Sequence, residues 1–155
     1  MSARVPAMSA SKTRMLTVEE LTSGKGDVPP RALRAIEQIS EAPWLAGVLR
    51  MFKRFQVLEY ARYLVLKAVA HDTSLPLQLA PSGPVEVVWH AHMLLPQEYF
   101  AMARALFGAG VVLEHDFAER RGEPYKTKLN FTIALYETVF GRAPPQEMWP
   151  RREMR

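Results

Sequence analysis

A chain of 155 residues with 48% hydrophobic content has enough apolar material for one globular domain with a single core. It contains no cysteine, which excludes a disulfide framework, a thiolate metal site and a cysteine nucleophile, and leaves His, Asp and Glu as ligands and acid–base groups. The net charge of +4 is spread along the sequence, so we expect no nucleic-acid partner, and no apolar run is long enough to predict a membrane span.

The N-terminal residues are rich in serine, alanine, methionine and arginine, with no acidic residue and no apolar run typical of a secretory signal. We expect a disordered leader at 1–15, a single helical domain at 16–150 and a basic tail at 151–155. Met1, Met8 and Met15 are all candidates for the start of translation, and the sequence does not distinguish them. Because no targeting signal is visible, a cytoplasmic location is expected.

Helical periodicity dominates the first half of the domain. Thr17 and Glu20 have the spacing of a capping box, and Pro29 and Pro30 open a second helix. The longest pattern predicts a core helix from Pro43 to Ala70. Its apolar positions recur at helical spacing and are Leu45, Val48, Leu49, Phe52, Phe55, Leu58, Tyr63, Leu66 and Val69. Its charged residues are expected mostly on the opposite side and are Arg50, Lys53, Arg54, Glu59, Arg62 and Lys67.

The stretch from Pro84 to Tyr99 contains two of the four histidines, a tryptophan and a carboxylate within an otherwise apolar run. Two local structures compete for it. As a helix, it places Glu86 and His90 four residues apart on one face, while His92 points nearly opposite to His90. As a strand, it would place all three side chains on one side. We favour the helix, because the helical pattern continues after this stretch.

The remaining third of the domain is also predicted to be helical. Glycines end the helix that follows Tyr99, and the short apolar run 111–116 then places His115 in a loop. Pro124 begins a final long helix, and the proline-rich segment 144–150 follows it, with Trp149 expected to pack back on the body. The fold class predicted from these patterns is all-α, a compact bundle of about five or six helices with a proline-rich C-terminal tail.

Imidazole and carboxylate side chains in and after the central stretch are candidate metal ligands. Without a thiolate, such ligands suit divalent Zn, Fe, Mn or Cu, and two histidines plus one carboxylate are found in non-haem iron oxygenases. The sequence therefore predicts a divalent metal site in a small helical domain, and one candidate use of such a site is in a metal-dependent enzyme of unspecified substrate. No nucleotide cofactor is indicated. The candidate ligands are Glu86, His90, His92 and His115, with His71 and Asp116 as further candidates.

An alternative interpretation gives the same side chains a structural role. A fully hydrogen-bonded cluster of imidazoles and a carboxylate fixes helix register without doing chemistry, and His92 would then bond a backbone carbonyl on the core side. The chain would be a non-catalytic protein-interaction module that binds through the Trp149 tail or through a basic helix face. That face comprises Arg50, Lys53 and Arg54. The expected partner is a small molecule under the first interpretation and a protein under the second.

A longer pattern surrounds the candidate ligands and comprises Glu86, Trp89-His90-x-His92-Met-Leu, Tyr99, Leu113-x-His115, Tyr136, Gly141, Pro144-Pro145 and Trp149-Pro150. It resembles the glycine-rich domain-containing proteins over roughly Pro43 to Pro150, with Trp-His-x-His as the distinctive part. In that family the acidic residue four before the first histidine is typically aspartate, whereas this chain has Glu86 and no glycine-rich tail. The resemblance implies a small helical domain in which this segment matters, and it implies no particular reaction.

Overall fold

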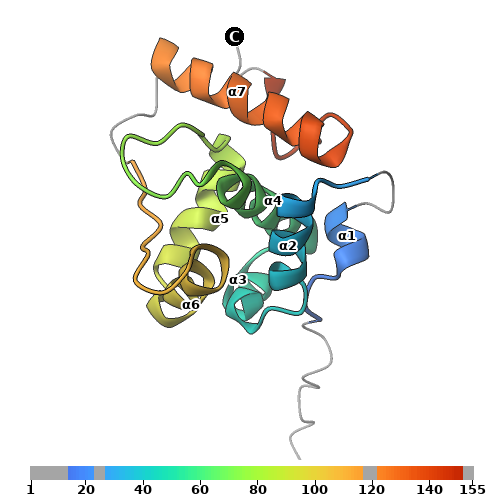
Figure 1. Ribbon diagram of the computed structural model, residues 1–155, viewed down its shortest axis with the longest axis vertical. Coiled ribbons are helices and arrows are strands. Elements are labelled where there is room, and N and C mark those ends of the chain that lie inside the picture. Colours follow the sequence, from blue (N-terminus) through green and yellow to red (C-terminus); the bar gives the residue numbers. More distant parts are fainter. Residues whose placement is uncertain (1–13, 23–26, 117–121, 152–155) are drawn as a thin grey trace, which may run out of the picture.

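The computed structural model describes residues 14–22, 27–116 and 122–151 (Figure 1). Within these ranges all regular structure is helical and no strand is present, so the all-α prediction is confirmed. Among the helices of these three ranges, none combines the length and apolar character needed to cross a bilayer. The predicted leader and basic tail lie almost wholly outside the described residues. The helices are α1 (Val18–Thr22), α2 (Pro30–Ile39), the 3₁₀ helix η2 (Pro43–Leu45), α3 (Ala46–Met51), α4 (Arg54–Ala70), α5 (Gly83–Met93), α6 (Pro96–Phe107) and α7 (Glu123–Phe140).

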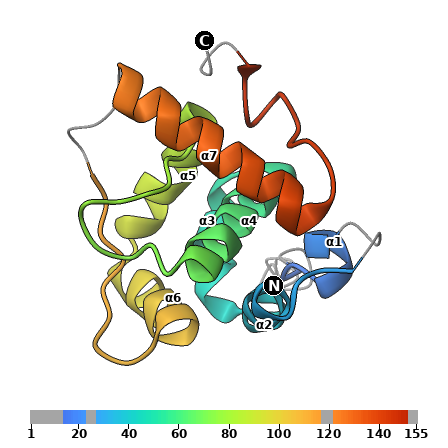
Figure 2. The ribbon, with the colours of Figure 1, turned by 45° about the horizontal axis from the view of Figure 1, so that its top comes forward.

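Helix α4 is the centre of the bundle. It packs against α1, α2, α5 and α7, and Figure 2 shows α7 crossing over it. From Glu59 to Lys67 every residue of the helix is buried, so this part of α4 has no solvent-facing stripe. The expected exposure of its charged residues is therefore wrong for Glu59, Arg62 and Lys67, which are 2%, 2% and 0% exposed.

The buried charges of α4 form a hydrogen-bonded network with both ends of the domain. The Glu59 carboxylate is paired with Arg62 and accepts hydrogen bonds from Tyr136 Oη at 2.9 Å and from Trp149 Nε1 at 3.1 Å. Arg62 also donates to the Leu21 carbonyl, at 3.1 Å. The network joins α4 to α1, α7 and the C-terminal tail. It explains why Trp149 packs back on the body, as predicted, with 2% of its surface exposed.

The helix predicted from Pro43 to Ala70 is divided in the structure into η2, α3 and α4. The chain is extended at Phe52 (φ −124°, ψ 162°) and at Lys53 (φ −66°, ψ 149°). The Gln56 side chain accepts a hydrogen bond of 2.9 Å from Lys53 N, which helps to cap the first turn of α4. Helical spacing of apolar residues continues through this break, so periodicity could not locate it.

The segment that carries the candidate ligands is helix α5. Ser82 is its N-cap, because Ser82 Oγ accepts a hydrogen bond of 3.3 Å from Val85 N. The same hydroxyl donates to the Met148 carbonyl, which ties the start of α5 to the C-terminal tail. Pro84 lies in the first turn, where a missing N–H costs nothing, and Pro96 starts α6. The helical alternative is thus confirmed and the strand alternative is wrong.

Candidate metal centre

Three of the predicted ligands meet at one point. Helix α5 carries Glu86 and His90 one turn apart, and the loop after α6 brings His115 to them. Glu86 Oε1 lies 3.2 Å from both His90 Nε2 and His115 Nε2, and the two Nε2 atoms are 3.0 Å apart. The His115 side chain is 3% exposed, that of Glu86 14% and that of His90 32%. The cluster therefore lies at the edge of the core, with the His90 side reachable from solvent.

The separations between these three atoms fit a shared ion. Ligand atoms about 2.1 Å from one ion are about 3.0 Å apart when their bonds meet at 90° and about 3.4 Å apart at the tetrahedral angle. The observed separations of 3.0, 3.2 and 3.2 Å fall within this interval. The three atoms are thus spaced as neighbouring ligands on one face of an ion, and the opposite face would be left for other ligands.

Trp89 and Tyr99 hold the loop that carries His115. Trp89 Nε1 donates to Tyr99 Oη at 3.0 Å, and Tyr99 Oη donates to the Leu113 carbonyl at 2.7 Å. Burial raises the pKa of Tyr99 to about 12, so the hydroxyl keeps the proton that it donates. The Trp89 indole also packs on the His115 imidazole, with ring centroids 4.3 Å apart. Two buried aromatic residues of the core therefore position a candidate ligand.

Glu114 connects the same loop to the segment that follows α4. Its backbone N–H donates to the Thr73 carbonyl at 2.8 Å, and its Oε2 accepts a hydrogen bond of 2.7 Å from Leu75 N. The residue just before His115 is thus fixed through both backbone and side chain. Loop residues fixed in this way keep the imidazole in place without help from a bound ion.

A buried ion pair between Lys67 and Asp72 packs against one face of the Trp89 ring. Lys67 Nζ donates to Asp72 Oδ2 at 2.9 Å and lies 5.2 Å from the Trp89 ring centroid. Asp72 in turn accepts hydrogen bonds from Gln78 N at 2.7 Å and Leu79 N at 2.9 Å. Burial lowers the pKa of Lys67, and the Asp72 carboxylate opposes that shift. Sequence reasoning missed this pair because Lys67 was placed on the solvent side of its helix.

Replacing Tyr99 with phenylalanine is expected to lower the free energy of unfolding by about 2 kcal/mol, because it leaves the Trp89 N–H and the Leu113 carbonyl buried without their partner. For a cluster that binds Zn²⁺, the affinity should fall roughly tenfold as the His115 loop loosens. Urea unfolding and zinc titration measure the two effects. Tyr60→Phe is the control, since the Tyr60 hydroxyl bonds His92 Nδ1, outside the cluster, and its loss should lower stability without changing zinc affinity. An equal loss of zinc affinity in both variants would contradict the positioning role of Tyr99.

A small cavity adjoins the cluster. Its volume is about 20 Å³, which is enough for one water-sized ligand. Helix α7 contributes Tyr125 and Lys128 to its wall, and Asp116 lines it beside His115 and Glu86. The cavity has room for one water molecule beside Glu86 and His115.

His92, the fourth predicted ligand, does not belong to the cluster. It lies on the other side of α5, where its Nε2 is 2.8 Å from the Trp44 carbonyl and its Nδ1 is 2.7 Å from Tyr60 Oη. Because a carbonyl only accepts, Nε2 carries the proton and Nδ1 accepts from the tyrosine. Both ring nitrogens of this fully buried imidazole are used in the core, as the structural interpretation of His92 expected.

Burial of His92 predicts a loss of stability in mild acid. Desolvation lowers its pKa from 6.5 to about 4, against a smaller opposing effect of the Trp44 carbonyl. Between pH 6.5 and 4 the unfolded chain therefore binds a proton that the folded chain does not, and stability falls as the pH falls. The loss attributable to this group is roughly 3 kcal/mol across that window.

The contribution of His92 is isolated by comparison with His92→Gln, whose amide does not titrate. Urea unfolding of both proteins between pH 7.5 and 4 should give a steeper decline for the unsubstituted chain. Parallel curves would show that His92 is not the group responsible.

The other candidate residues lie apart from the three converging ligands or at their margin. His71 is exposed at the end of α4, and Asp116 lines the cavity without joining the group whose ligand atoms converge. The two surfaces proposed for the interaction module, the basic helix face and the Trp149 tail, are less available to a partner than the sequence suggested. Arg54 is bonded to Glu20, with Nε 2.6 Å from Oε2, and Trp149 is buried.

Comparison with known proteins gives one informative similarity. The chain is 31% identical over 94 residues to glycine-rich domain-containing protein 1 of Arabidopsis thaliana. The matched segment is 59% of this chain but 11% of the plant protein, so the chain spans about a tenth of that relative's length. No family model and no solved structure matches. The similarity agrees with the resemblance drawn from the sequence pattern and is compatible with a distant relationship to that family.

Proposed function

We propose that Glu86, His90 and His115 hold one divalent metal ion, and that the chain is a small metal-dependent enzyme related to the glycine-rich domain-containing proteins. The observation that carries this proposal is the convergence of three ligand atoms, separated by 3.0 to 3.2 Å, from two segments of the chain. A second observation supports the proposal. The loop that carries His115 is fixed by the Tyr99 hydrogen bond to Leu113, and it holds the His115 imidazole beside the Glu86 carboxylate at the edge of the core.

The ligand set favours a catalytic over a purely structural ion. Structural zinc sites are usually closed by four protein ligands, whereas catalytic sites keep positions open for water or substrate. Here three protein ligands converge, and the adjoining cavity has room for about one water. Two imidazoles and one carboxylate suit Zn²⁺, Fe²⁺, Mn²⁺ or Cu²⁺. Such an ion supplies either a more acidic bound water or a centre for oxygen chemistry.

The competing function is an interaction module in which the cluster is structural. One observation favours it, since separations of 3.0 to 3.2 Å also suit hydrogen bonds in which the two imidazoles and the carboxylate share protons. A surface hollow of about 320 Å³ beside the exposed Leu94 and lined by Arg50 would then be the place to look for a partner. Metal binding separates the two functions.

The deciding experiment is metal analysis of the purified full chain before and after dialysis against a chelator. The proposal predicts about one ion per chain, lost on chelation and restored by one of the four metals. At a free metal concentration of 100 times Kd, the ion should add about 2.7 kcal/mol of stability, equivalent to a rise in Tm of about 5–10 °C. A stoichiometry near zero together with an unchanged Tm in all four metals would leave the interaction module as the better account.

A further inference from the structure

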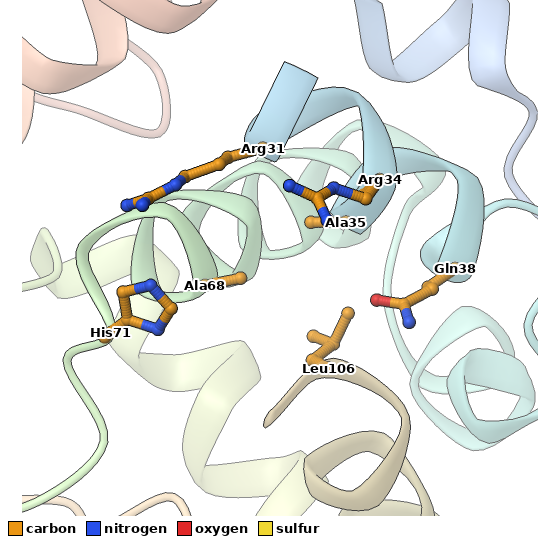
Figure 3. Close-up of a pocket in the computed structure, with 7 residues that line it drawn as sticks. All are labelled: Arg31, Arg34, Ala35, Gln38, Ala68, His71 and Leu106. Carbon is orange, nitrogen blue, oxygen red and sulfur yellow. The ribbon is translucent and has the colours of Figure 1, made fainter. Parts of the chain in front are cut away.

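A second cleft lies away from the metal-ligand cluster, where α2, the end of α4 and α6 meet (Figure 3). Its volume is about 370 Å³, within the range of roughly 300–1,000 Å³ that is usual for small-molecule sites. None of the three converging ligands lines it. Any ligand of this cleft would therefore be recognised by other side chains.

The polar wall of the cleft is made of hydrogen-bond donors. Arg31 and Arg34 lie one turn apart on α2, and Gln38 and His71 face the same space (Figure 3). Within the described ranges, none of these four side chains has a hydrogen bond or ion pair, and no Asp or Glu lines the cleft. Arg54, by contrast, is held by Glu20. Guanidinium groups left without a carboxylate are suited to an external anion.

The backbone at His71 gives an independent reason to regard the cleft as a built site. His71 ends α4 in the left-handed region, at φ 51° and ψ 40°. Helices commonly end in that conformation with glycine, because a side chain there adds strain of about 1–2 kcal/mol. The side chain retained here is an imidazole directed into the cleft (Figure 3). A residue that strains the backbone while facing a cleft is a candidate for ligand recognition.

The floor of the cleft is apolar. Ala35 is buried, and Ala68 and Leu106 are half-buried beneath the charged groups. An inorganic ion would leave this floor uncovered, whereas an organic molecule with an apolar part would cover it. We infer that the cleft binds a small organic anion, with a phosphate or carboxylate group at Arg31, Arg34 and His71 and an apolar group over Leu106.

The test is a titration of the isotope-labelled full chain with phenyl phosphate, benzoate and inorganic phosphate, followed by NMR. Phenyl phosphate or benzoate should shift the signals of the Arg34 side chain, His71 and Leu106, and whichever binds tighter identifies the headgroup. Inorganic phosphate should bind several-fold more weakly than phenyl phosphate, because it does not cover the apolar floor. Shifts confined to His90 and His115, or none at tens of millimolar, would overturn the inference.

Two double variants that remove the same positive charge distinguish specific binding in the cleft from nonspecific attraction of anions to a basic protein. R31Q/R34Q should weaken binding roughly tenfold or more, because it removes both guanidinium groups. R50Q/R104Q removes the same charge from exposed positions elsewhere and should leave the affinity within about twofold. Equal weakening by both double variants would show diffuse charge attraction and overturn the inference.

His71→Gly gives a readout that does not depend on the arginines. Glycine suits the left-handed backbone, so the variant should be at least as stable as the unsubstituted chain while binding phenyl phosphate several-fold more weakly. An unchanged affinity in this variant would overturn the inferred site, because it would show that His71 does not contact the anion and that its left-handed backbone serves no role in binding.

Discussion

Replacing Glu59 with alanine is expected to lower the free energy of unfolding by about 3–5 kcal/mol, because it leaves the Arg62 guanidinium buried without its counter-ion. The same change removes the acceptor of Tyr136 Oη and of Trp149 Nε1. The C-terminal tail would then lose the hydrogen bond by which Trp149 holds it to α4. Urea unfolding followed by circular dichroism measures the stability, and tryptophan fluorescence in a W44F/W89F background reports the environment of Trp149.

Two further variants separate the buried charge from the loss of any glutamate. Glu37→Ala removes a carboxylate from an exposed position of α2 and should change stability by no more than about 0.5 kcal/mol. The double variant E59M/R62M removes both charges and keeps most of the volume, so it should be more stable than Glu59→Ala. A double variant as unstable as the single one would show that packing, and not the unpaired guanidinium, dominates the loss.

The Glu59 network also shows where sequence reasoning reaches its limit. Helical spacing is a local property, and it correctly predicted an all-α chain and the helical state of the segment that carries Glu86 and His90. Which side of a helix is buried depends on what covers it. Glu59 bonds to residues 77 and 90 positions away, and no pattern within α4 encodes those partners.

The candidate metal site also has a part that local spacing predicts and a part that only the fold determines. The relation of His90 to Glu86 is a single helical turn and could be predicted directly. His115 lies 25 positions from His90, and its arrival depends on the Trp89–Tyr99–Leu113 hydrogen bonds, which only the fold displays. Helix geometry alone separates His92 from the other ligands, because side chains two residues apart on a helix, such as those of His90 and His92, differ in direction by about 200°. Its neighbours in the core could not be identified from the sequence.

The metal proposal leads to the other large expected effect. Replacing His90 with alanine should weaken binding of Zn²⁺ by roughly two to three orders of magnitude, because structural zinc affinities of about 10–16 kcal/mol shared among four ligands correspond to about 2.5–4 kcal/mol each. His90 is the preferred position because its side chain is 32% exposed, so its removal should disturb folding little. His115 packs on Trp89, and its replacement would mix the loss of a ligand with a loss of stability.

Competition with a chromophoric chelator measures the affinity of each variant, and the visible spectrum with Co²⁺ reports the coordination. Glu86→Gln should behave like His90→Ala, because it keeps the side-chain shape while replacing the carboxylate with a weaker amide ligand. His71→Ala removes a histidine that lies outside the cluster and should leave both measurements unchanged. Equal weakening by His71→Ala and His90→Ala would mean that zinc binds surface imidazoles at random. Retention of tight binding by both His90→Ala and Glu86→Gln would mean that the converging atoms are joined by shared protons, and the metal proposal would fail.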